Sequence, residues 1–157
     1  MSIEDRLADL GIDLPPVAKP VAAYVPAIQV GDQISTSGQL PLVSGSLPMT
    51  GLVGDQISQG DAAGQARVAA LNALAAAADV AGGVNNIRRV VRVVVYVAST
   101  ADFTAQPAVA NGASELFGEI FGDAGRHIRS AIGVASLPLG APVKLSLIHI
   151  SEPTRPY

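Results

Sequence analysis

Apolar and polar positions along the chain change their period several times, and each change predicts a new element. In residues 88–97 every odd position from 91 onward is valine, which predicts a strand with one β-branched face that packs on helices. The even face holds Arg92 among the apolar residues Val90, Val94 and Tyr96. An apolar face interrupted by one charge suits contact with another subunit or a cleft. The alternative, a charge at the edge of the monomer's own core, stays open.

Two stretches, 58–81 and 103–121, carry apolar residues at helical spacing and are predicted to be the main helices. The first is rich in alanine, whose small side chain lets a helix lie close to a sheet. A shorter helix is predicted for residues 2–10, with Ser2 as its N-cap and Gly11 after its end.

Short β-prone runs account for the remaining predicted elements, and Gly31-Asp32 joins the first two as a hairpin. Two other segments are expected to lack regular structure: 12–26, which contains four prolines, and 38–55, which is rich in Gly, Pro and Ser. A short strand near 50–53 is the one exception expected there. The predicted strands are 27–30, 33–37, 88–97, 128–134 and 143–150.

The order of these elements is hairpin, helix, strand, helix, strand, strand. It predicts an α+β fold in one domain, with a mixed sheet and the two main helices packed on one face. We divide the chain into an N-terminal helix and proline-rich lead-in (1–23), the domain itself (24–150) and a tail (151–157).

Composition narrows the possible functions. The 157 residues are 49% hydrophobic, enough for one core, and they include no cysteine for a disulfide or a thiolate metal site. A net charge of −3 offers no general basic surface, so no nucleic-acid partner is expected. The N-terminus lacks the pattern of a signal peptide, and the apolar run 90–98 is far shorter than the roughly 20 residues of a membrane helix. We expect a cytoplasmic protein without a membrane partner.

Common catalytic templates do not fit the chain. His127 and His149 lack the spacing of metal ligands, so no metal is expected. No nucleophile elbow or phosphate-binding glycine loop occurs, and no cofactor is expected. His127, next to a predicted turn and between Arg126 and Arg129, is interpreted as a surface or packing residue.

Arg129 is the most informative residue, because it falls inside the otherwise apolar strand 128–134. Burying a guanidinium without a partner is costly. Its partner is either an internal acid, such as Asp123 or Glu115, or the carboxylate of a ligand held in bidentate fashion. Spacing alone favours the internal ion pair.

Three segments together favour the ligand carboxylate over the internal acid as the partner of Arg129. Residues 129–138 (RSAIGVASLP) resemble the Arg-Ser/Cys strand leading to Leu-Pro in the Rid family, also called YjgF/YER057c/UK114. Residues 24–41 resemble that family's N-terminal hairpin, which ends in Ser-Gly-Gln-Leu-Pro, and residues 111–117 (NGASELF) resemble its second helix, where an Asn occurs. The resemblance runs from Tyr24 to Val143, and the longer N-terminus is closer to a less-characterised branch.

The resemblance implies a chorismate-mutase-like fold, assembled as a homotrimer with ligand sites in clefts between subunits. It also implies hydrolysis of reactive enamines and imines, such as 2-aminoacrylate, to a 2-keto acid and ammonia without a cofactor. Arg129 would be the catalytic residue that holds the substrate carboxylate. Tyr24 and Ser37 would line the cleft, with the Gly38 backbone near the ligand and Asn111 on the opposing wall. Each of the polar side chains also has a packing interpretation.

The alternative is a non-catalytic protein that binds a small carboxylate metabolite in the same clefts. One departure of the chain from the family pattern bears on this choice. The family's deaminases usually carry a Glu in the last strand, where this chain has Lys144. A protonated lysine cannot accept a proton from water, so help from a general base at this position is in doubt.

The end of the chain bears on the identity of the residue at position 144. The run that starts at Leu145, LSLIHISEPTRPY, resembles the peptide obtained when a sequencing adaptor is translated in frame. Either the native last strand was replaced by this run, which would make Lys144 uninformative, or the terminus is natural and divergent. The tail 151–157 is expected to be disordered or artefactual.

Overall fold

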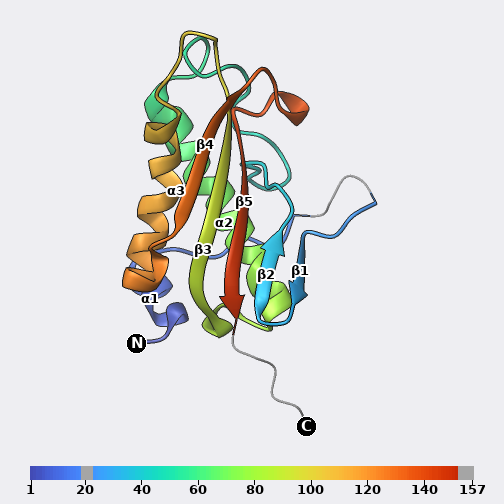
Figure 1. The fold of residues 1–157 in the computed structure, drawn as a ribbon, viewed down its shortest axis with the longest axis vertical. Helices are drawn as coiled ribbons and strands as arrows, with labels where there is room; N and C mark the ends of the chain where they lie inside the picture. The colour runs from blue at the N-terminus through green and yellow to red at the C-terminus, as the bar shows by residue number, and fades with distance from the viewer. Residues whose placement is uncertain (19–22, 152–157) are drawn as a thin grey trace.

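A computed structural model describes residues 1–18 and 23–151 (Figure 1). The helices are α1 (Ile3–Asp9), α2 (Gln59–Ala81) and α3 (Gln106–Phe121), with short 3₁₀ turns η1 (Val84–Asn86), η2 (Gly122–Gly125) and η3 (Pro138–Gly140). The strands are β1 (Ala27–Val30), β2 (Gln33–Thr36), β3 (Ile87–Ala98), β4 (Ile128–Val134) and β5 (Val143–Ser151).

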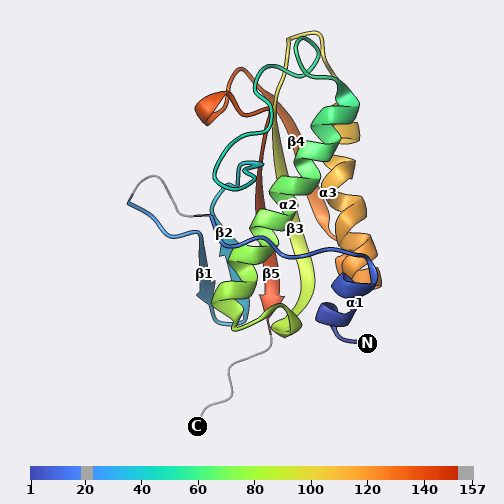
Figure 2. The same cartoon turned by 180° about the vertical axis from the view of Figure 1, so that it is seen from behind.

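The five strands form one mixed sheet in the order β1-β2-β5-β3-β4. Only the β3–β4 pair is parallel; the other neighbours run antiparallel. Figures 1 and 2 show α2 and α3 on one face of the sheet, while the other face carries no helix. The predicted α+β class, with a mixed sheet and two main helices on one face, is confirmed.

Local signals place the helix ends where the sequence predicts them. Ser2 and Asp5 form a capping box at the start of α1. Ser58 caps α2 by accepting a hydrogen bond from the Asp61 amide, and Gly82 ends that helix in the left-handed conformation that glycine adopts without strain.

The alanine-rich helix α2 packs closely on its neighbours. Twelve of its side chains are buried, most of them alanine. At Gly112 of α3 the two helices approach so closely that a Cβ would collide with the Ala63 backbone of α2. The small residues therefore set the distance between the helices.

Helix α3 begins at Gln106, three residues later than the predicted Phe103. Pro107 lies in its first turn, the place where a missing backbone N–H costs nothing. The Phe103 amide instead donates to Thr100 O in a turn. The predicted apolar face of the helix is buried and includes Leu116 and Phe117.

The predicted faces of β3 are wrong at its N-terminal end. Val90 pairs with His149 and Arg92 with Ile148, so Val91 is an extra residue in a β-bulge. The bulge reverses the predicted alternation: Val90, on the predicted mixed face, is fully buried, and Val91, on the predicted valine face, is only half-buried. From Val93 onward the valine face lies in the core, as predicted.

The expected short strand near 50–53 does not form. Val53 makes only isolated bridges, to Ile57 and to Ser99. The start of the loop 38–55 is held by Asn72 of α2, whose side-chain amide donates to the carbonyls of Leu40 and Leu42 at 3.0 Å each. The described parts of the lead-in, 12–18 and 23–26, have no helix or strand, as expected. Positions 19–22 and 152–157 lie outside the described residues.

Strand β5 is central in the sheet, and its residues alternate strictly between buried and half-buried. His149 occupies one of the buried positions, between the rings of Phe117 and Phe121. Neither ring nitrogen makes a well-formed hydrogen bond. Burial lowers the pKa of His149 from 6.5 to about 4, and the nearby Arg89 backbone opposes that shift only in part.

We expect Gly112→Ala to destabilise the protein by roughly 1–3 kcal/mol or more, because the added methyl group collides with backbone rather than with a movable side chain. Gly64→Ala, on an exposed position of α2 with open space around it, is the matched control. It should be neutral or stabilising by about 0.4–1 kcal/mol. Urea unfolding of both variants measures the difference, and equal stabilities would contradict the close approach of the helices.

We also expect His149 to destabilise the fold in acid. The unfolded chain takes up a proton near pH 6.5 but the folded one only near pH 4, so stability falls as the pH drops through this interval. The full effect is roughly 3 kcal/mol. Relative to His149→Leu, the wild type should lose this amount between pH 7 and pH 4 in urea titrations. A constant difference between the two proteins across that range would contradict the buried neutral imidazole.

Candidate ligand-binding site

Arg129 lies on the edge strand β4, opposite Val93 in the parallel pair. Paired residues of neighbouring strands point to the same face, so the Arg129 side chain points to the helix side, beneath α3. Its Nη1 donates to Asn111 Oδ1 at 2.7 Å and to Ser114 Oγ at 3.1 Å. The structure thus brings Arg129 and Asn111 together, and adds Ser114.

These two hydrogen bonds use both protons of Nη1. The Nε proton and the two Nη2 protons make no hydrogen bond to any described residue. The Nε and Nη2 groups lie side by side on this edge of the guanidinium, in the geometry that holds a carboxylate in bidentate fashion.

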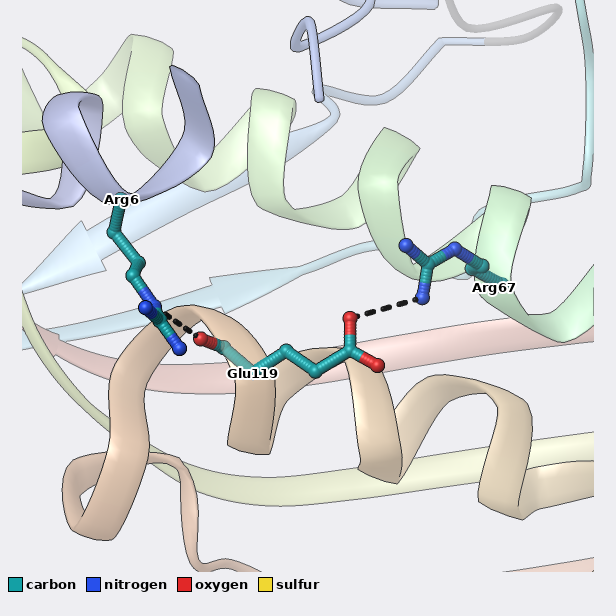
Figure 3. Close-up of polar contacts among 3 residues, drawn as sticks. All are labelled: Arg6, Arg67 and Glu119. Atoms are coloured by element: carbon teal, nitrogen blue, oxygen red, sulfur yellow. Dashed lines mark hydrogen bonds and ion pairs between the residues drawn. The ribbon is translucent and has the colours of Figure 1, made fainter. Parts of the chain in front are cut away.

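The internal ion pair favoured by spacing alone does not form with either Asp123 or Glu115. Among residues 1–18 and 23–151 the only ion pair joins Arg67 of α2 to Glu119 of α3, at 3.4 Å (Figure 3). Glu119 also accepts a hydrogen bond from Arg6 of α1 through its backbone oxygen, at 2.8 Å. The two contacts of Glu119 together link α1, α2 and α3, and an exposed ion pair of this kind lends little stability.

His127 continues the network from Ser114. The distance from Ser114 Oγ to His127 Nε2 is 2.9 Å, and that from His127 Nδ1 to the Gly125 carbonyl oxygen is 2.7 Å. Gly125 lies directly against the Phe117 backbone with no room for a side chain, which fixes its carbonyl. The edge of the His127 ring also meets the Phe117 ring. An open pocket beside this network is lined by Ser114, Gly118, Gly125, Arg126, His127 and Arg129.

The other predicted site residues gather elsewhere. Tyr24, Ser37 and Gly38 line a mostly apolar pocket of about 160 Å³ together with Leu139 and Lys144. The Ser37 hydroxyl donates to the Pro26 carbonyl at 3.1 Å. The Lys144 stem lies directly against Gly38, so that a Cβ there would require this flexible side chain to move. A cationic residue therefore borders the pocket at the start of β5.

The predicted residues thus form two groups in different pockets. Arg129 lies at the β4 edge under α3, where Asn111 of that helix binds it. The second group lies beyond β3, where β2 leads into its loop and β5 begins. One copy of the chain does not join Arg129 to Tyr24, Ser37 or Gly38 in a single pocket.

Sequence reasoning missed Ser114 and the hydrogen bonds of His127, although the ring of His127 does pack on Phe117, as its interpretation as a surface or packing residue allows. The available signal was spacing: Ser114 follows Asn111 by three residues and so lies on the same helical face. His127 was interpreted as a packing or surface residue, and its hydrogen bonds depend on the path of η2, which spacing does not reveal.

No group of three or more His, Cys, Asp or Glu side chains among the described residues is placed to hold a metal ion. None of the described helices has the length and apolar character needed to cross a membrane.

Comparisons with known proteins agree with this architecture. The chain is 40% identical to Protein TCP17 of Trypanosoma cruzi over 91% of its own length and 90% of that protein's. It resembles the crystal structure of the protein Atu1372 of unknown function from Agrobacterium tumefaciens, with 41% identity, a TM-score of 0.87 and coverage of 96% and 92% of the two chains. A "putative endoribonuclease" from Shewanella oneidensis gives 32% identity, a TM-score of 0.91 and coverage of 96% and 99%.

A family model matches residues 4–150, which is nearly the whole chain. Its description reads "YjgF/chorismate mutase-like, putative endoribonuclease". The chain belongs to this YjgF family.

Proposed function

We propose that the protein is a hydrolytic deaminase of reactive enamines and imines, which releases a 2-keto acid and ammonia. The observation that carries the proposal is the open side of Arg129: Nη1 is held by Asn111 and Ser114, while Nε and Nη2 are left for a carboxylate. A guanidinium fixed in this way loses little side-chain entropy on binding a ligand.

The proposed assembly is a homotrimer in which a neighbouring subunit completes the site. Within one chain Arg129 and the pocket of Tyr24, Ser37 and Gly38 are separate, so a ligand that touches both groups needs two copies. The helix-free face of the sheet also carries exposed apolar side chains of the kind that interfaces cover, among them Ile28 and Ile132.

The proposed reaction needs few protein groups. The carbon of an imine is already electrophilic, so fixing the carboxylate and placing a water account for much of the catalysis. We propose a small carboxylate as the ligand and the cytoplasm as the location. The endoribonuclease function named in the family description is less favoured, because a net charge of −3 opposes binding of a polyanion.

Lys144 favours a second candidate, a binding protein for a small carboxylate metabolite. Lys144 lines the same pocket as Tyr24 and Ser37, where a cation adds attraction for an anion but is not a base for water. This candidate predicts saturable binding that depends on Arg129, without turnover.

Arg129→Ala tests the proposal. We expect it to remove most of the acceleration of ammonia release from an enzymatically generated 2-imino acid, because the carboxylate loses charge-assisted hydrogen bonds. A loss of about 2–4 kcal/mol corresponds to roughly a 30- to 1,000-fold lower kcat/KM. Arg67→Ala, an exposed arginine in the surface ion pair, is the matched control and should keep the wild-type rate. Equal rates for wild type and Arg129→Ala would overturn the deaminase assignment, and binding without any turnover would establish the second candidate.

A further inference from the structure

We infer that Ser114 and His127 are positioning residues that fix the orientation of the Arg129 guanidinium and thereby set how tightly the site holds a carboxylate. The inference rests on the proposed function, because it concerns the same anchor, and it adds two residues that do not touch the ligand themselves. It is carried by a continuous chain of hydrogen bonds from the backbone of η2 to Nη1 of Arg129.

The chain of hydrogen bonds starts at a carbonyl group that is held in place. Gly125 of η2 lies so close to the Phe117 backbone that a Cβ at this position would collide with it. The Gly125 carbonyl oxygen lies 2.7 Å from Nδ1 of His127, and the imidazole ring meets the Phe117 ring edge to face. Because two contacts at different points hold the imidazole, the position of its Nε2 atom follows from the path of η2.

The donors and acceptors follow from the atoms that meet. A carbonyl oxygen only accepts, so Nδ1 of His127 carries the proton that is directed at Gly125. The Ser114 hydroxyl oxygen accepts from Nη1 of Arg129 at 3.1 Å. Among the described residues the hydroxyl proton meets one acceptor, Nε2 of His127, at 2.9 Å. The imidazole is therefore the neutral tautomer with its proton on Nδ1.

The direction of the Ser114 proton decides what Arg129 meets. A serine inside a helix otherwise tends to donate to the backbone carbonyl of the preceding turn, which turns its oxygen toward the helix. His127 accepts this proton instead and leaves the lone pairs of the oxygen for Nη1. Asn111 Oδ1 accepts the second Nη1 proton at 2.7 Å. With both protons engaged, the plane of the guanidinium is fixed and its Nε–Nη2 edge is left for a carboxylate.

A fixed guanidinium binds a carboxylate at lower cost than a mobile one. A free arginine side chain occupies many rotamers, and a ligand that has to order it loses part of its binding free energy. Ser114 and Asn111 order the Arg129 side chain before a ligand arrives. The carboxylate makes the same contacts in the bound substrate and in the transition state. Loss of the Ser114–His127 pair should therefore raise KM and leave kcat nearly unchanged.

The competing interpretation is that the pair only fastens η2 to α3 and supports the fold. A purely structural role predicts a lower free energy of unfolding, with normal affinity in the protein that remains folded. Positioning predicts lower affinity in a protein of normal stability. Ser114→Ala separates the two well, because alanine is the best helix former and should not weaken α3.

The test uses the full chain and the variants Ser114→Ala, His127→Ala and His127→Gln. Three properties are measured for each: the Kd of pyruvate by calorimetry, KM and kcat for ammonia release from an enzymatically generated 2-imino acid, and stability in urea. Thr104→Ala, which removes an exposed hydroxyl just before α3, is the matched control and should change none of them.

We expect Ser114→Ala and His127→Ala to raise both Kd and KM about tenfold, with kcat within about threefold of wild type. The effect is smaller than that of Arg129→Ala because Asn111 still holds Nη1. His127→Gln should restore most of the affinity, since an amide offers one N–H donor for the Gly125 carbonyl and one oxygen acceptor for the Ser114 hydroxyl.

Wild-type affinity in Ser114→Ala or in His127→Ala overturns the inference, and so does His127→Gln that binds as weakly as His127→Ala. Affinity that falls only together with stability shows a structural role instead. A wild type that binds pyruvate without accelerating the reaction overturns the deaminase proposal alone, because the Kd values still decide the positioning role. A wild type that does not bind pyruvate removes the carboxylate anchor and the inference with it.

Discussion

The structure depends on the pairing of β5 between β2 and β3. This strand crosses the centre of the sheet, and its buried side chains, Leu145 and Leu147 among them, face the alanine-rich helix α2. Without it the hairpin of β1 and β2 would have no partner, and the parallel pair of β3 and β4 would stand alone. A two- or three-stranded piece of this kind is marginal in water. The central strand therefore holds both halves of the candidate site in one sheet.

The same pairing places the two groups of site residues. The Gln39 amide and carbonyl both pair with Leu145, which brings Ser37 and Gly38 next to Lys144. On the other side β3 carries β4, so that Arg129 comes to lie beneath α3. The groups are separated because they belong to opposite sides of the central strands, and this separation is what makes a second copy of the chain necessary for a composite site.

Periodicity was sufficient to predict the elements but not the details that shape the site. Runs of valine or alanine, caps such as Ser58 and turn glycines are local signals, so the helices, the hairpin and the three later strands were predicted within a few residues. The bulge at Val91 arises from register with β5, which is a long-range property, and it reversed the predicted faces there. Ser114 and His127 meet because η2 returns the chain beneath α3, and no spacing rule contains that path.

The two groups of site residues depend to different degrees on the side chains of β5. The hydrogen-bond network around Arg129 is built from residues 111–129, and it needs from β5 only its presence as a strand, not its particular side chains. The second group includes Lys144, which stands next to the adaptor-like run, and that run also supplies the buried, unsatisfied ring of His149. A strand with an apolar residue in place of that imidazole would fill the same space at lower cost. The open side of Arg129 is therefore independent of the side chains that β5 carries. The chemistry of the opposing pocket, in contrast, depends on the residue at position 144.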